Sequence, residues 1–174
     1  MNKILKIATV LSWINMIFWG FVCLVFLWGV LSSGASAMLI ILIFPSAIVL
    51  HSYAAFQLQK SIKKPAVPLS SQTSGGIRFI GFIALFVGLM MLIQGIGTLT
   101  NPQAALKQWQ DITKDLQSQT STKETVLTPT LFRVHLIGIF GLLIGLSVAI
   151  NVNFNFRLLR WYHFLRNNSN DREK

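Results

Sequence analysis

The chain has 174 residues, of which 53% are hydrophobic and only 11% are charged. Soluble domains carry about 25% charged residues, so this composition excludes an ordinary water-soluble fold. The formal net charge of +10 comes from 15 basic and 5 acidic residues, and the single cysteine, Cys23, excludes an intramolecular disulfide and a multi-cysteine metal site.

Four apolar segments predict four transmembrane helices. We place them at about residues 7–31, 38–58, 77–98 and 131–151, each near or above the roughly 20 residues that cross about 30 Å of hydrocarbon. Backbone polar groups cannot remain unpaired in lipid, so each segment is expected to be helical. The predicted fold class is an all-α integral membrane protein, a four-transmembrane-helix antiparallel bundle in which residues 1–174 form a single membrane domain.

The first segment follows the charged start "MNKILK", as the core of a signal peptide does. Its apolar stretch is longer than the roughly 7 to 15 residues of such a core, so we expect an uncleaved span. Eleven basic residues then fall on one side of the bundle: Lys3, Lys6, Lys60, Lys63, Lys64, Arg78, Arg157, Arg160, Arg166, Arg172 and Lys174. Only Lys107, Lys114, Lys123 and Arg133 fall on the other. Because cytoplasmic loops are rich in Lys and Arg, we expect a plasma (inner) membrane protein with both termini in the cytoplasm.

The loop after the second span, "KKPAVPLSSQTSGG", is expected to be a mobile tether. Pro65 and Pro68 end the preceding helix, and the Ser, Thr and Gly residues that follow favour irregular chain.

An extracytoplasmic amphipathic helix is predicted at about residues 102–118, between the third and fourth spans. Asn101 can cap it, Pro102 suits its first turn, and apolar residues recur at helical spacing: Ala105, Trp109, Ile112 and Leu116. This surface helix either rests on the bundle and headgroups as a lid or presents a face to a partner.

Glycines on the third and fourth spans are candidate helix-packing residues. They are Gly81, Gly88 and Gly95 on the third span and Gly138, Gly141 and Gly145 on the fourth. Small residues permit the close backbone approach that joins helices in lipid. We expect these two helices to pack tightly, either on each other or across a subunit interface.

Polar residues inside the spans are the candidate functional residues, because they are costly in lipid. Asn15 and His51 are expected near the cytoplasmic side, where they can hydrogen-bond to each other. Gln94, His135 and Arg133 are expected to form a second polar cluster under the surface helix. Each cluster serves either as interhelical hydrogen bonding or as an ion or ligand site.

The tail at residues 152–174 mixes basic and aromatic side chains. Its candidate membrane-interface residues are Arg157, Arg160, Trp161, Tyr162 and Arg166. Aromatic rings favour the headgroup level and arginines attract anionic cytoplasmic lipids, so the tail is predicted to anchor the chain at the membrane surface. Docking to a cytoplasmic partner is the alternative, and nucleic-acid binding is not expected. Asn151 and Asn155, which share a helix face just before this tail, either line a polar vestibule or cap a helix irregularity.

No pattern of catalytic, metal-binding or cofactor-binding residues is present. All carboxylates lie outside the spans, and no Cys-x-x-Cys or glycine-rich phosphate loop occurs. We therefore predict a non-enzymatic protein without a cofactor or metal, acting through helix and loop contacts as an accessory subunit of a membrane complex or as a homo-oligomeric scaffold. Its expected partners are the lipid bilayer and other membrane subunits or further copies of itself. The alternative is a small oligomeric channel or transporter whose polar pathway runs near Asn15, His51, Gln94 and His135.

Overall fold

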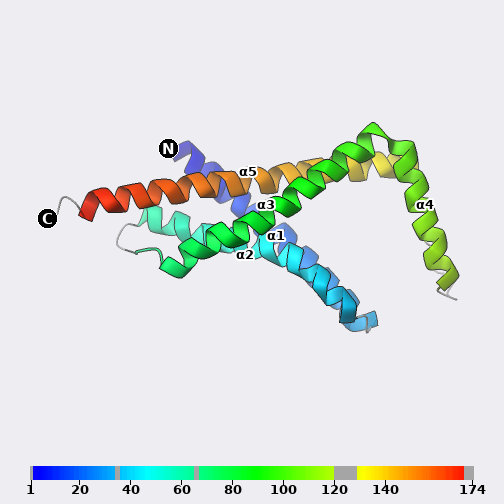
Figure 1. The fold of residues 1–174 in the computed structure, drawn as a ribbon, viewed down its shortest axis with the longest axis horizontal. Coiled ribbons are helices and arrows are strands. Elements are labelled where there is room, and N and C mark those ends of the chain that lie inside the picture. The colour runs from blue at the N-terminus through cyan, green and yellow to red at the C-terminus, as the bar shows by residue number, and fades with distance from the viewer. Residues whose placement is uncertain (1, 34–35, 65–66, 120–128, 171–174) are drawn as a thin grey trace. The chain divides into compact units, whose positions relative to one another are not determined.

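The computed structural model describes residues 2–33, 36–64, 67–119 and 129–170, and every regular element in these ranges is a helix. In chain order (Figure 1) the elements are α1 (Asn2–Ser33), the short 3-10 helix η1 (Ser36–Leu42), α2 (Ile43–Lys63), α3 (Ser71–Thr100), α4 (Pro102–Gln119) and α5 (Leu131–Asn170). The prediction of an all-α chain is therefore confirmed for the described residues. Lys123, Arg172, Lys174 and the side chain of Leu116 lie outside them.

Four helices are long and apolar enough to cross a membrane. They are Lys3–Ser32, Leu39–Lys63, Ser71–Thr100 and Leu131–Arg166, and each contains one of the predicted spans almost completely. The length and composition of these segments are those of transmembrane helices. The helices extend beyond the apolar segments, most of all at the end of α5, where the polar tail is helical up to Asn170.

The prediction of a mobile tether is wrong for the second half of the loop after α2. Helix α3 begins at Ser71, so residues 71–76 are helical. Two contacts with α5 hold this weakly helix-forming sequence: the Leu69 backbone N–H donates to the Tyr162 hydroxyl oxygen at 2.8 Å, and Ser74 Oγ lies 3.0 Å from His163 Nε2. Tertiary contacts therefore override the low helix propensity of Ser, Thr and Gly.

The chain divides into two compact units. Unit 1 comprises residues 1–88 and 147–174, and unit 2 comprises residues 89–146. Helices α3 and α5 contribute residues to both, while α1 and α2 belong to unit 1 and α4 to unit 2.

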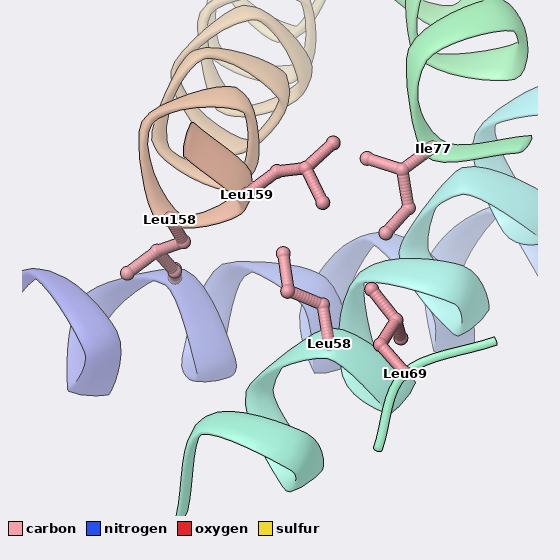
Figure 2. Close-up of a cluster of buried hydrophobic side chains, with 6 residues drawn as sticks. Leu58, Leu69, Ile77, Leu158 and Leu159 are labelled. Carbon is pink, nitrogen blue, oxygen red and sulfur yellow. The ribbon is translucent and has the colours of Figure 1, made fainter. Parts of the chain in front are cut away.

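The core of unit 1 is an apolar cluster from α1, α2, α3, α5 and the segment before α3. Its buried residues are Ala8, Leu58, Leu69, Ile77, Leu158 and Leu159. In Figure 2, Leu159 and Ile77 point toward one another beside Leu58 and Leu69, while Leu158 points toward α1. Within the same unit α1 and α2 pack along each other. The ring of Trp13 is edge-on to that of Phe56, and the two ring centres are 5.2 Å apart.

Unit 2 contains the surface helix. The Asn101 side-chain oxygen accepts a hydrogen bond from the Ala104 backbone N–H at 3.3 Å and so caps α4, which begins at Pro102. Ala105, Trp109 and Ile112 of α4 line a cavity of about 300 Å³ whose other walls come from the end of α3 and the start of α5. The apolar side of α4 is thus the side that faces this cavity.

Candidate functional site

A hydrogen-bonded group of four buried side chains, the polar cluster, joins three helices of unit 1. It consists of Ser12 on α1, Gln59 on α2, and Asn151 and Asn155 on α5. Gln59 Nε2 donates to Ser12 Oγ at 3.2 Å and to Asn155 Oδ1 at 3.1 Å. Asn151 Oδ1 accepts from Ser12 Oγ at 3.0 Å and from Asn155 Nδ2 at 3.0 Å. Each side chain thus makes at least two hydrogen bonds, and most of them cross between helices.

The spacing of these residues explains why they meet. Ser147, Asn151 and Asn155 follow one another at intervals of four, so they lie on one face of α5. Ser12 and Asn15 are three residues apart on α1, again on one face. Buried polar side chains need hydrogen-bond partners, so these residues pair across helices. The polar face of α5 formed by Ser147, Asn151 and Asn155 therefore packs against the faces of α1 and α2 that carry polar partners.

Asn15 lies beside the polar cluster but does not contact His51 through a hydrogen bond. Its Oδ1 accepts a long hydrogen bond of 3.4 Å from Ser147 Oγ, while its Nδ2 has no partner among the described residues. The structure thus joins Asn15 to α5 rather than to His51 on α2.

His51 is fully buried at a contact of three helices. Its ring is edge-on to Phe156 of α5, with ring centres 6.2 Å apart. A Cβ on Gly81 of α3 would lie 2.7 Å from the Phe156 ring and 2.9 Å from His51 Cε1, so this position has no room for a larger residue. The ring lies beside the Ile77 backbone, yet neither ring nitrogen makes a well-formed hydrogen bond to a described residue. The neighbouring Ser52 hydroxyl also has none.

The three residues of the second predicted polar group do not all line the cavity of unit 2. Gln94 lines the cavity beneath α4. His135 is exposed, and its Nδ1 lies 2.8 Å from the Leu131 carbonyl oxygen of its own helix. Arg133 is half-buried and is not among the residues that line the cavity. Of these three residues, only Gln94 is among those that line the cavity.

Glycines bring α3 and α5 into close contact within unit 2. A Cβ on Gly95 would lie 2.8 Å from the Leu142 backbone nitrogen and 2.9 Å from the Gly138 carbonyl oxygen. A Cβ on Gly138 would lie 2.8 Å from Leu99, and one on Gly141 would lie 3.6 Å from Gly95 Cα. At Gly95 the two backbones therefore approach to a distance that only glycine permits, whereas at Gly141 a Cβ would make an ordinary contact. Of the other candidates, Gly88 is buried in unit 1 and Gly145 in unit 2.

The tail residues of α5 differ in their surroundings. Arg157 and Arg166 are exposed, Trp161 is half-buried, and Tyr162 holds the Leu69 backbone. Arg160 lies at the rim of a cavity of about 320 Å³ in unit 1, here called the basic cavity. Its lining residues are Arg78, Phe82, Phe156, Leu159 and Arg160.

Sequence reasoning missed Ser12 and Gln59 as members of the polar cluster. Both lie near the ends of apolar segments, where polar side chains are common. The available signal was the four-residue repeat of Ser147, Asn151 and Asn155, because a polar stripe on one helix requires polar partners on its neighbours.

The arrangement supplies hydrogen bonds and packing. Within the described residues no group of three or more His, Cys, Asp or Glu side chains is placed to hold a metal ion. Among the residues that the structure describes, the buried groups without a hydrogen-bond partner are amides, a hydroxyl, an indole and one imidazole. Comparisons of the chain with protein-family models, with curated proteins and with solved structures find no match.

Proposed function

We propose that the chain is a non-catalytic membrane protein that acts through helix and loop contacts, as an accessory subunit of a membrane complex or as a homo-oligomeric scaffold. The observation that carries this proposal is the polar cluster, in which Gln59, Ser12 and the two asparagines bond to one another across three helices. The donors and acceptors that bond to one another hold helices together and are not free to bind a passing solute. Gln59 Oε1 is the exception in this cluster, since it has no hydrogen-bond partner among the described residues.

The proposal includes an antiparallel arrangement of four spans in the plasma (inner) membrane, with both termini in the cytoplasm. Two contacts between α1 and α2 support it, because Trp13 meets Phe56 while the later residue Cys23 meets the earlier residue Ser46. The gathering of basic residues in the two termini and the α2–α3 loop supports the orientation.

Open glycines on α1 support association with another helix. At Gly20 and Gly29 a Cβ would meet no atom within 4 Å, in contrast to the filled positions on α3 and α5. A neighbouring membrane helix can approach closely at such positions.

The test is the mass of the assembly after gentle extraction. In mild detergent we expect a particle heavier than the 19.5 kDa chain with its detergent, formed with further copies or with another subunit. Gly20→Ile and Gly29→Ile should shift it toward the monomer without changing thermal unfolding, and Gly20→Ala, which keeps the residue small, should leave it intact. A lone monomer without any recovered partner would contradict the proposal.

The second candidate function is a small oligomeric channel or transporter using Asn15, His51, Gln94 and His135. It is favoured by buried polar atoms that have no hydrogen-bond partner in the described part of the chain, among them Asn15 Nδ2, both His51 ring nitrogens and Ser52 Oγ, since such atoms in proteins usually bind water or a ligand. Dye-loaded proteoliposomes that report proton, potassium and chloride flux provide the test. Flux that is lost in His51→Ala or His135→Ala would favour transport, and no flux in the wild type would oppose it.

A further inference from the structure

The basic cavity of unit 1 has a charged end and an aromatic end. On α3, Arg78 precedes Phe82 by four residues, and on α5, Arg160 follows Phe156 by four residues. Helices α3 and α5 run in opposite directions along this contact, because Ser74 lies against His163 while the later residue Gly81 lies against the earlier residue Phe156. The two arginines therefore lie at one end of the cavity and the two phenylalanines about 6 Å away, one helical turn farther along.

The arginines have no carboxylate to pair with in the described part of unit 1. Residues 2–88 and 147–170 contain no Asp or Glu. Two like charges at one cavity repel each other unless an anion lies between them. Guanidinium groups bind phosphate through paired N–H donors, so a phosphate group is the anion that this pair fits best.

The rest of the cavity is suited to a hydrocarbon chain. Leu159 and Phe156 form its apolar wall, and Phe82 is 64% exposed. A free phosphate ion would leave these side chains without a role, whereas a phospholipid would place its acyl chains against them. The volume of about 320 Å³ is at the lower end of the roughly 300 to 1,000 Å³ range of ligand pockets.

We propose that the basic cavity binds one acidic membrane phospholipid, with its phosphate between Arg78 and Arg160 and an acyl chain along Phe82 and Phe156. This site is more specific than a general attraction of basic residues to anionic membranes, because it assigns two particular arginines. It rests on the membrane insertion included in the proposed function, and it is independent of whether the chain assembles with partners.

The experiment uses the full chain, extracted in a neutral detergent and offered dioleoyl phosphatidylglycerol or dioleoyl phosphatidylcholine, with retained lipid counted by native mass spectrometry. We expect one phosphatidylglycerol per chain, held in preference to phosphatidylcholine. Arg78→Gln and Arg160→Gln should each lower its retention roughly tenfold, as loss of a hydrogen bond to a charged group predicts.

Arg157→Gln is the matched control, because Arg157 lies on the same helix as Arg160, is exposed and does not line the cavity. It removes the same charge and should leave retention unchanged. Equal losses in Arg157→Gln and Arg160→Gln, or equal retention of the two lipids by the wild type, would overturn the proposal. Displacement of the lipid by excess inorganic phosphate would also overturn it, since the site would then recognise the ion alone.

Thermal unfolding of each variant should show that the fold persists, because the substituted side chains are exposed, and Arg78→Lys should restore part of the retention. A monomeric chain that still holds phosphatidylglycerol would contradict the assembly proposal and support the lipid site. A chain that assembles but retains the two lipids equally would support the assembly proposal and contradict the lipid site.

Discussion

The two units of the molecule join their helices in different ways. In unit 1, α1, α2 and α5 are linked by hydrogen bonds among Ser12, Gln59, Asn151 and Asn155. In unit 2, α3 and α5 approach through glycines, and at Gly95 a Cβ would lie within 3 Å of backbone atoms of α5. Pairing of polar side chains and close backbone approach are two means by which apolar helices are joined. The hydrogen-bonded cluster belongs to unit 1, which also has a close glycine contact at Gly81, whereas the close approach of glycine to backbone atoms of the neighbouring helix is found in unit 2.

The largest effect is expected where a substitution meets backbone atoms in unit 2. In Gly95→Ile the new Cβ would lie within 3 Å of the Leu142 nitrogen and the Gly138 oxygen, which cannot rotate away. Overpacking costs about 1 to 3 kcal/mol and occasionally more, and we expect about 3 kcal/mol of unfolding free energy here. Reversible unfolding in bicelles measures it.

Gly97 provides the control for that experiment. It lies two residues away on the same helix, and a Cβ there meets no atom within 4 Å. Gly97→Ile should therefore change stability by less than about 0.5 kcal/mol. If the two variants were equally stable, the close contact in unit 2 would not be what joins its helices.

The next effect breaks the polar cluster of unit 1. Asn151→Leu removes the acceptor of both the Ser12 hydroxyl and the Asn155 amide, leaving two buried donors short of a partner. We expect a loss of about 2 kcal/mol in unfolding free energy, measured as for Gly95. Asn153→Leu, on an exposed position of the same helix, should cost almost nothing. Similar losses at both positions would show that burial of the amides is not the cause.

A smaller loss is expected at Gly81, where unit 1 also uses glycine. In Gly81→Ala the methyl group meets the Phe156 and His51 rings rather than backbone, so part of the clash is relieved by small ring movements. A loss of about 1 kcal/mol should appear in thermal unfolding. Gly76→Ala, in open space on the same helix, should be neutral or stabilising by up to about 1 kcal/mol. If both variants were more stable than the wild type, the close contact at Gly81 would be contradicted.

The smallest single-site effect is expected at the loop before α3. Tyr162→Phe removes the acceptor of the Leu69 backbone N–H. The global loss should be under about 1 kcal/mol, with faster amide hydrogen exchange at Leu69 as the direct readout. Tyr53→Phe is the matched change, because that hydroxyl is exposed and accepts a hydrogen bond from Gln57, one turn along its own helix. Unaltered exchange at Leu69 would mean that the tyrosine does not hold the loop.

The sequence was sufficient for the features that depend on local chemistry. Runs of apolar residues predicted the four long helices, and Asn101 with Pro102 indicated where α4 begins. The helical residues 71–76 could not be foreseen, because Tyr162 and His163, about 90 residues away, hold them. Local propensity carries no information about such contacts.

Partner choice among the polar residues was also beyond the sequence. The sequence allows a hydrogen bond between Asn15 and His51, but Asn15 bonds to Ser147, and it is Gln59 of α2 that hydrogen-bonds to Asn155 of α5. Hydropathy gives the length of a span but not its rotation about its own axis, which packing against neighbours determines. The four-residue polar repeat indicates which face of α5 turns toward its neighbours, but it gives no such information for the other helices.

The most direct test of the account is a double-mutant cycle between Gln59 and Asn155, with unfolding free energies measured for Gln59→Ala, Asn155→Ala and the double variant. The account predicts a favourable coupling between the two side chains of about 0.6 to 1.7 kcal/mol, as for interhelical hydrogen bonds in other membrane proteins. The control cycle at Gln57 and Asn153, which are not hydrogen-bonded to each other, should give none. Additive losses at Gln59 and Asn155 would contradict the claim that the buried polar residues of unit 1 hold its helices together.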